Sequence, residues 1–95
     1  MPTFEHKGLG VSATVPDDLR YRDVEAFFKA RRELGGDESI SSPEYCGTIV
    51  RAAARLGWIE GVDENGVGEL KGGAVIWLSG KIQNEVTGAM AVPPE

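Results

Sequence analysis

Residues 43–57 read PEYCGTIVRAAARLG, which predicts a helix that other helices can approach closely. Serines precede Pro43, a typical helix start, since serine caps free amides and proline is tolerated at the first helical position. Three consecutive alanines follow, and small side chains shorten the distance between packed helices. The predicted apolar stripe consists of Tyr45, Ile49, Ala52, Ala53 and Leu56. We expect this helix over 43–56, ended by Gly57.

A helix is also predicted before this stretch, over 21–34. Its apolar residues from Val24 to Leu34 recur three and four positions apart, which is the spacing of one helix face. Asp23 opens the helix and two arginines lie in its last turns, so both ends suit the helix dipole. The glycines at 35 and 36 end it.

A third helix is predicted over 74–91, where apolar residues from Val75 to Met90 again have helical spacing. Gly80 and Gly88 fall inside it, and each costs about 0.5–1 kcal/mol relative to alanine. Tertiary contacts must therefore hold this helix in place. Between the second and third helices, residues 60–73 contain five glycines and several acids, and we expect them to form a flexible loop.

The N-terminal residues predict β structure. Side chains alternate along 3–15, with apolar residues at every second position from Leu9 to Val15, and Pro16 ends the pattern. The glycines at 8 and 10 allow this region to bend into a short hairpin. The predicted fold is thus a mainly α, three-helix domain with a short N-terminal β-strand or hairpin, formed by residues 1–95 as a single domain.

The composition limits the function. Ninety-five residues, 41% of them hydrophobic, form one core and leave little room for a separate catalytic domain. The chain begins without the basic start and apolar run of a secretory signal, and no apolar stretch approaches the ~20 residues that a membrane helix needs. We therefore expect a cytoplasmic protein without a membrane partner. Its single cysteine, Cys46, cannot form an internal disulfide.

The charge pattern disfavours nucleic acid as a partner. The formal net charge is −5, and the acids are concentrated in residues 37–70. Lys29, Arg31 and Arg32 form a small basic cluster, which fits the C-terminal end of a helix as well as a nucleic-acid patch. The gaps between the predicted helices are also longer than the three or four residues of a helix-turn-helix. We expect no nucleic-acid binding.

The sequence contains no arrangement typical of catalysis. His6 and Cys46 are far apart in the chain, and a nucleophile requires a base within reach. One histidine and one cysteine do not provide the usual ligand spacing of a metal site. The stretch from Gly66 to Lys71 has lysine where the third glycine of a GxGxxG motif belongs. We therefore expect no enzyme activity, no metal and no cofactor.

A protein partner remains as the predicted ligand. The candidate partner-binding residues are large apolar side chains that a small three-helix domain need not cover fully: Phe28, Trp58, Ile59, Trp77 and Met90. Tryptophan is enriched in binding hot spots, although in a chain with few large side chains each tryptophan also suits the core.

Two stretches carry a family resemblance. Residues 15–27, VPDDLRYRDVEAF, and residues 74–95, from AVIWL to VPPE, resemble the opening helix and the closing helix of small tail-assembly-chaperone-like proteins of long-tailed phages and prophages. The resemblance implies a non-enzymatic role in the host-cell cytoplasm. Such a protein binds the long helical tape-measure protein, keeps it soluble and helps recruit tail-tube subunits.

Three interpretations stay open at this point. The first is the tail assembly chaperone, with the tape-measure protein or another tail protein as partner. The second is a structural virion or interaction protein that remains in the particle, and the third is a small transcriptional regulator. Self-association into a homo-oligomer is compatible with the first two, because a small domain gains stability by burying apolar surface against a second copy.

Overall fold

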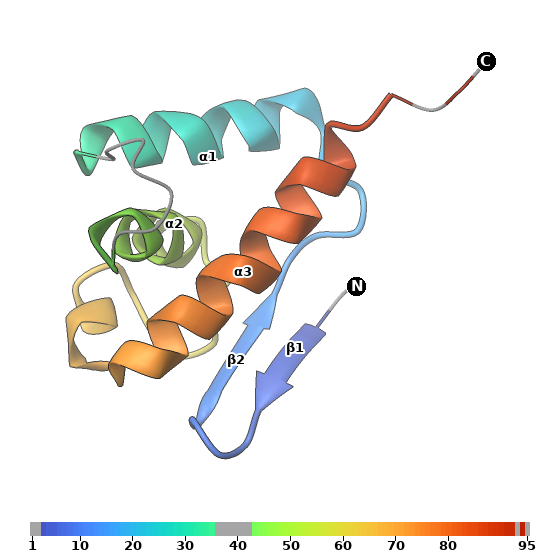
Figure 1. The fold of residues 1–95 in the computed structure, drawn as a ribbon. Helices are drawn as coiled ribbons and strands as arrows, with labels where there is room; N and C mark the ends of the chain where they lie inside the picture. The colour runs from blue at the N-terminus through green and yellow to red at the C-terminus, as the bar shows by residue number, and fades with distance from the viewer. Residues whose placement is uncertain (1–2, 36–42, 93, 95) are drawn as a thin grey trace.

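The computed structural model describes residues 3–35, 43–92 and 94, and in them three α-helices follow a β-hairpin (Figure 1). In chain order the elements are β1 (Thr3–His6), β2 (Val11–Thr14), α1 (Tyr21–Glu33), α2 (Pro43–Arg55), the short 3-10 helix η1 (Gly66–Glu69) and α3 (Gly72–Ala89). The predicted mainly α class with an N-terminal hairpin is confirmed. The predicted capping serines, Ser41 and Ser42, lie outside the described residues.

α2 is the central helix, and it packs against α1, α3 and η1. Its alanines lie inside the packed core, since Ala52 and Ala53 are fully buried. Burial extends further around α2 than the predicted stripe, since Gly47 and Val50 are buried as well. A helix that is apolar on most of its surface is contacted from several sides.

A turn at the end of α2 returns the chain to the core. Gly57 has a φ of +80°, and its N–H donates to the Ala54 carbonyl at 3.0 Å. The next N–H, that of Trp58, donates to the Ala53 carbonyl at 2.9 Å, which completes a Schellman motif. The Trp58 ring then stacks on Phe27 of α1, with 5.6 Å between centroids and 11° between planes.

The segment after this turn pairs with β2. The Thr14 N–H donates to the Trp58 carbonyl at 2.8 Å, and the Glu60 N–H donates to the Ser12 carbonyl at 3.0 Å. Ala13 and Ile59 form an antiparallel bridge between these bonds. β2 is therefore paired on both sides, by β1 and by residues 58–60.

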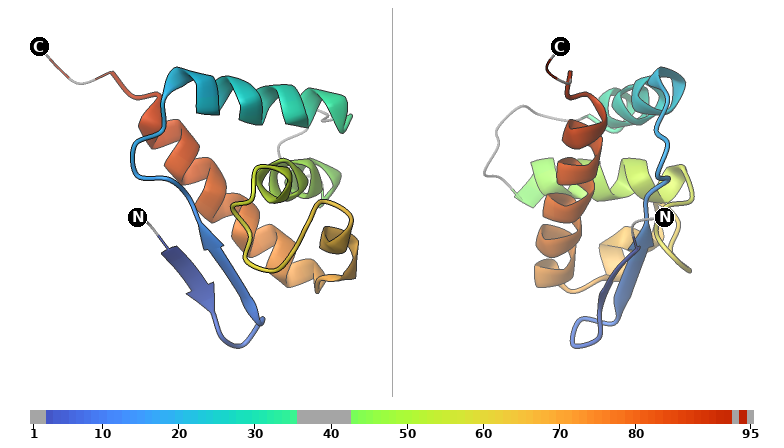
Figure 2. Two further views of the ribbon diagram at one scale, coloured as in Figure 1. Left: turned by 180° about the vertical axis from the view of Figure 1, so that it is seen from behind. Right: turned by 90° about the vertical axis from the view of Figure 1, so that its right-hand side faces the viewer.

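The hairpin packs against α3 (Figure 2). Its strands are antiparallel, with Phe4 opposite Ala13, and the Gly10 N–H closes the four-residue loop by donating to the His6 carbonyl at 2.9 Å. The His6 ring meets Trp77 of α3 edge to face at 5.2 Å. The Lys81 ammonium lies 5.7 Å from the Trp77 ring and 5.9 Å from the Phe4 ring. Side chains of the hairpin thus cover one face of α3.

Hydrogen bonds from backbone N–H groups fix both ends of α1. The Asp23 carboxylate accepts a 2.9 Å hydrogen bond from the Arg20 N–H, which fixes the first turn although arginine cannot cap a helix as serine does. At the other end Gly35 has a φ of +77°, and its N–H donates to the Arg32 carbonyl at 3.1 Å. α1 is held to α2 partly by Arg31, whose guanidinium lies 4.7 Å from the Tyr45 ring centroid.

Residues 60–73 contain more regular structure than the predicted loop. They include η1, whose Val67 is 3% exposed and belongs to the core. The Asp63 carboxylate accepts the Gly66 N–H at 2.7 Å and positions the start of this turn. α3 begins at Gly72, two residues before the predicted position, and it ends at Ala89 after passing through Gly80 and Gly88 without a break.

No helix in the described parts of the chain combines the length and the apolar character needed to cross a bilayer.

Candidate functional site

Two of the five predicted partner-binding residues lie in the core. Trp58 is 7% exposed and Ile59 is 4% exposed, so neither offers a surface to another protein. The Schellman turn at Gly57 returns the chain to the core at Trp58, and the bridge between Ile59 and Ala13 holds the next residue against β2. This part of the predicted docking surface is corrected.

Trp77 lies under the hairpin. It is half-buried between the His6 ring and the Lys81 side chain, on the side of α3 that faces β1. Its ring therefore joins two elements of the fold and does not lie next to the remaining two predicted residues.

Phe28 and Met90 come together in one groove. The groove encloses about 300 Å³ between α1 and the C-terminal end of α3, and its lining residues are Tyr21, Val24, Glu25, Phe28, Arg32 and Met90. Tyr21 is 78% exposed and Met90 is 47% exposed, which is high for large apolar side chains. The groove thus presents apolar groups to solvent, with one acid and one base beside them.

The groove exists because α1 packs mainly on α2. Val24, Phe27 and Ala30 form the buried face of α1, while the C-terminal end of α3 comes beside α1 where Met90 lines the groove. The two helices converge at the start of α1 and diverge toward its end (Figure 2). Among the described residues, no element consequently covers the side chains on this flank of α1.

Four groove residues were missed by the sequence interpretation: Tyr21, Val24, Glu25 and Arg32. A signal was available for three of these four. Tyr21, Glu25 and Arg32 lie in line with the predicted Phe28, at spacings of four, three and four positions, so they share a helix face that differs from the buried one. The position of α3 beside that face depends on tertiary packing and carries no local signal.

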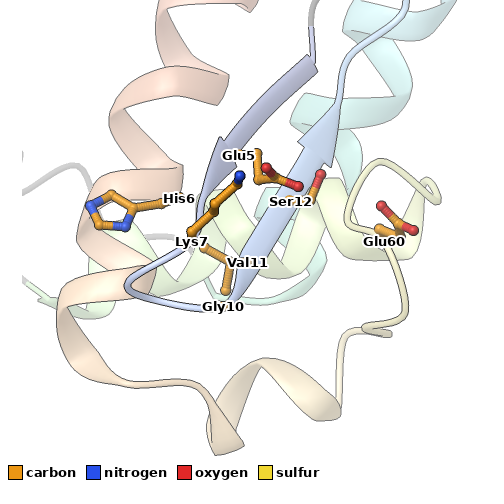
Figure 3. A pocket seen from close by; sticks show the side chains of 7 residues that line it. All are labelled: Glu5, His6, Lys7, Gly10, Val11, Ser12 and Glu60. Carbon is orange, nitrogen blue, oxygen red and sulfur yellow. The ribbon is translucent and has the colours of Figure 1, made fainter.

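A second, polar pocket lies on the hairpin (Figure 3). It encloses about 430 Å³, and Glu5, Ser12 and Glu60 line it together with the loop of the hairpin. His6 also borders the pocket, but its ring points away toward α3, where its Nδ1 accepts the Leu9 N–H at 3.2 Å. The hydroxyl of Ser12 therefore has no imidazole beside it to act as a base.

Cys46 lies in a different place. It lines a pocket of about 210 Å³ between α2 and α3, beside Gln83 and Asn84, and His6 is not part of that pocket. The structure does not bring His6 and Cys46 together. Within residues 3–35, 43–92 and 94, no three His, Cys, Asp or Glu side chains gather as a metal site requires.

An ion pair with two hydrogen bonds connects helix ends on another part of the surface. The Arg55 guanidinium donates two hydrogen bonds to the Glu64 carboxylate, at 3.0 and 2.9 Å, and lies 3.6 Å from Glu33. These hydrogen bonds lower the pKa of the Glu64 carboxyl and raise the pKa of Arg55. The pair links the ends of α1 and α2 to the 60–73 segment, so its role is structural.

Comparison with known proteins adds no further constraint. No protein-family model, curated protein or solved structure matches the chain. The function is therefore inferred from the groove and from the resemblance described above.

Proposed function

We propose that this protein is a non-enzymatic assembly protein that binds a helical segment of another protein in the groove between α1 and α3. The observation that carries the proposal is the exposure of Tyr21 and Met90 at the rim of a groove whose wall includes Phe28. Amphipathic helices bind in such grooves through apolar residues spaced three, four and seven positions apart.

The resemblance to tail-assembly-chaperone-like proteins makes the partner specific. The proposed partner is the tape-measure protein of a long-tailed phage, bound in the cytoplasm of the host cell during tail assembly. A tape-measure protein is long and largely helical, so it offers many amphipathic segments. Binding covers their apolar faces and keeps the protein soluble before the tail tube forms around it.

The groove suits transient binding. One acidic and one basic side chain, Glu25 and Arg32, flank a small apolar surface. A groove of this size buries less apolar surface than a permanent interface, and affinity depends on a few central residues. Release of the partner at the end of assembly requires such limited affinity.

Co-expression with the tape-measure protein of the same genome tests the proposal. The wild-type protein should increase the soluble fraction of the partner and co-purify with it. Met90→Ser should weaken the binding by about tenfold or more, because it removes an apolar contact at the groove. Ile76→Ser is the matched control, since Ile76 is exposed to a similar degree, 50% against 47%, on a part of α3 outside the groove.

The result that contradicts the proposal is a partner that stays insoluble and does not co-purify with the wild-type protein. Equal loss of binding in both variants would place the contact elsewhere. Mass spectrometry of purified particles separates this role from that of a virion component, because a chaperone should be missing from finished tails.

A further inference from the structure

One flank of α1 carries four groove residues in a single row. Tyr21, Glu25, Phe28 and Arg32 are four, three and four positions apart, so at 100° per residue they fall within one narrow stripe of the helix. We call these four residues the α1 stripe. In the part of the chain that the structure describes, α1 forms an outer edge and no other helix or strand lies beyond it (Figure 1).

The charges of the α1 stripe have a defined order. Glu25 and Arg32 are seven residues apart, which is two helical turns or about 10.5 Å along the axis. Phe28 lies between them, near the midpoint. Both charged side chains line the groove, and in the described parts of the chain neither forms a salt bridge. Each therefore has its charge available for a partner.

We propose that the α1 stripe binds the same stripe of a second copy of this chain, forming an antiparallel two-fold dimer. A two-fold axis passing near Phe28 places Glu25 of each copy opposite Arg32 of the other. The two Phe28 rings meet at the axis, and Tyr21 covers the ends of the contact. The interface is self-complementary, as a two-fold interface has to be.

The order of the charges selects this orientation. A parallel arrangement places Glu25 opposite Glu25 and Arg32 opposite Arg32, and like charges directly opposite each other disfavour association. The antiparallel arrangement also places the two helix dipoles in opposite directions. A second copy of α1 in antiparallel orientation thus places an apolar ring opposite Phe28 and an opposite charge across from both Glu25 and Arg32.

The net charge of −5 on each copy opposes association at long range. The contact itself is locally neutral, with one acid and one base from each copy. Added salt screens the long-range repulsion as well as the two exposed ion pairs, so charge reversal is a more direct test than salt. The inference goes beyond the proposed function, since it concerns the purified chain alone.

Charge-reversal variants test the dimer by sedimentation equilibrium at protein concentrations between about 1 μM and about 1 mM. Wild type should show a reversible monomer–dimer equilibrium. Glu25→Arg and Arg32→Glu alone should each raise the dissociation constant about tenfold or more, because each creates two like-charge pairs. Arg22→Glu is the control, since Arg22 is on α1 but does not line the groove.

Restoring the dimer by combining the two charge reversals distinguishes the antiparallel contact from a general effect of net charge. An equimolar mixture of Glu25→Arg and Arg32→Glu chains should form heterodimers, because every Arg then faces a Glu. The double variant should dimerise as wild type does. Circular dichroism of each variant checks that the helices are retained, and the double variant keeps the test valid where a single variant is less stable.

Three results would overturn the inference: a wild type that is monomeric over the whole concentration range, single variants that dimerise as wild type does, or a mixture that fails to restore the dimer. Each is measured on the purified chain without a partner, so it is scored separately from the co-expression experiment. Because the dimer covers Tyr21 and Phe28, which also line the groove of the proposed function, a bound partner helix and the dimer exclude each other. A monomeric wild type that still solubilises its partner removes the dimer and leaves the proposed function.

Discussion

Two glycines in open space should respond to the same substitution with opposite signs. Gly57 ends α2 with a φ of +80°, whereas Gly80 lies inside α3, and a methyl group added at either position would meet no atom within 4 Å. Crowding is therefore excluded as a cause in both cases. Only the conformation of the backbone distinguishes the two positions.

The magnitudes follow from that conformation. Gly57→Ala places an L-residue in the left-handed region, which costs roughly 1–2 kcal/mol, partly offset by the lower entropy of the unfolded chain. We expect a net loss of about 1 kcal/mol, which lowers the melting temperature of a domain this size by about 4–8 °C. Gly80→Ala should instead stabilise the protein by about 0.5–1 kcal/mol, because alanine favours the helix interior.

Urea unfolding followed by circular dichroism measures both changes. The midpoints should move in opposite directions while the dependence of the unfolding free energy on urea stays constant, since the same surface is exposed. A Gly57→Ala protein as stable as wild type would contradict the prediction, because the turn at Gly57 would then tolerate an L-residue. A loss above about 3 kcal/mol would mean that Trp58 also leaves the core.

Further predictions concern the tryptophans, the ion pair and the hairpin. Trp58→Ala should cost about 3–5 kcal/mol and Trp77→Ala clearly less, because only Trp58 is buried among core residues; a protein retaining Trp58 alone should also show the bluer fluorescence. Because the pKa of Glu64 is lowered in the folded protein, the stabilisation from its ion pair is present above the pKa of the unfolded carboxyl and is lost as the pH falls through the folded value. The stability of the wild type should therefore fall more steeply than that of Glu64→Gln as the pH drops below roughly 4. Glu60→Gln is the control and should follow wild type, because in the described residues the Glu60 carboxylate forms no salt bridge. Leu9→Ser should weaken the packing of the hairpin on α3, and hydrogen exchange should rise in β1 more than in α2.

Local signals explain why most of the fold was predictable. The helix ends at Gly35 and Gly57 need a left-handed residue, and glycine marks both positions in the sequence. The alternation before Pro16 depends only on neighbouring residues, and the hairpin forms as expected. Helix boundaries differ by one or two residues, as frayed ends do.

Long-range pairing explains what could not be predicted. Ala13 and Ile59 are 46 positions apart, and nothing in either local stretch indicates that residues 58–60 pair with β2. The same limit separates the two tryptophans. Trp58 follows α2 and Trp77 lies inside α3, and both have apolar neighbours in the sequence. The turn at Gly57 places Trp58 in the core, whereas the packing of the hairpin on α3 leaves Trp77 beneath His6.

The candidate groove follows from the same central packing. The apolar faces of both α1 and α3 pack on α2, so these two helices have little apolar area left to pack on each other. In the described part of the chain, the flank of α1 is therefore uncovered. The groove residues Tyr21 and Met90 contribute little to the core, whereas Phe27 is 2% exposed on the buried face of α1. Substitutions on the flank should therefore change association much more than stability. The proposed function and the proposed dimer can for this reason be tested without unfolding the protein.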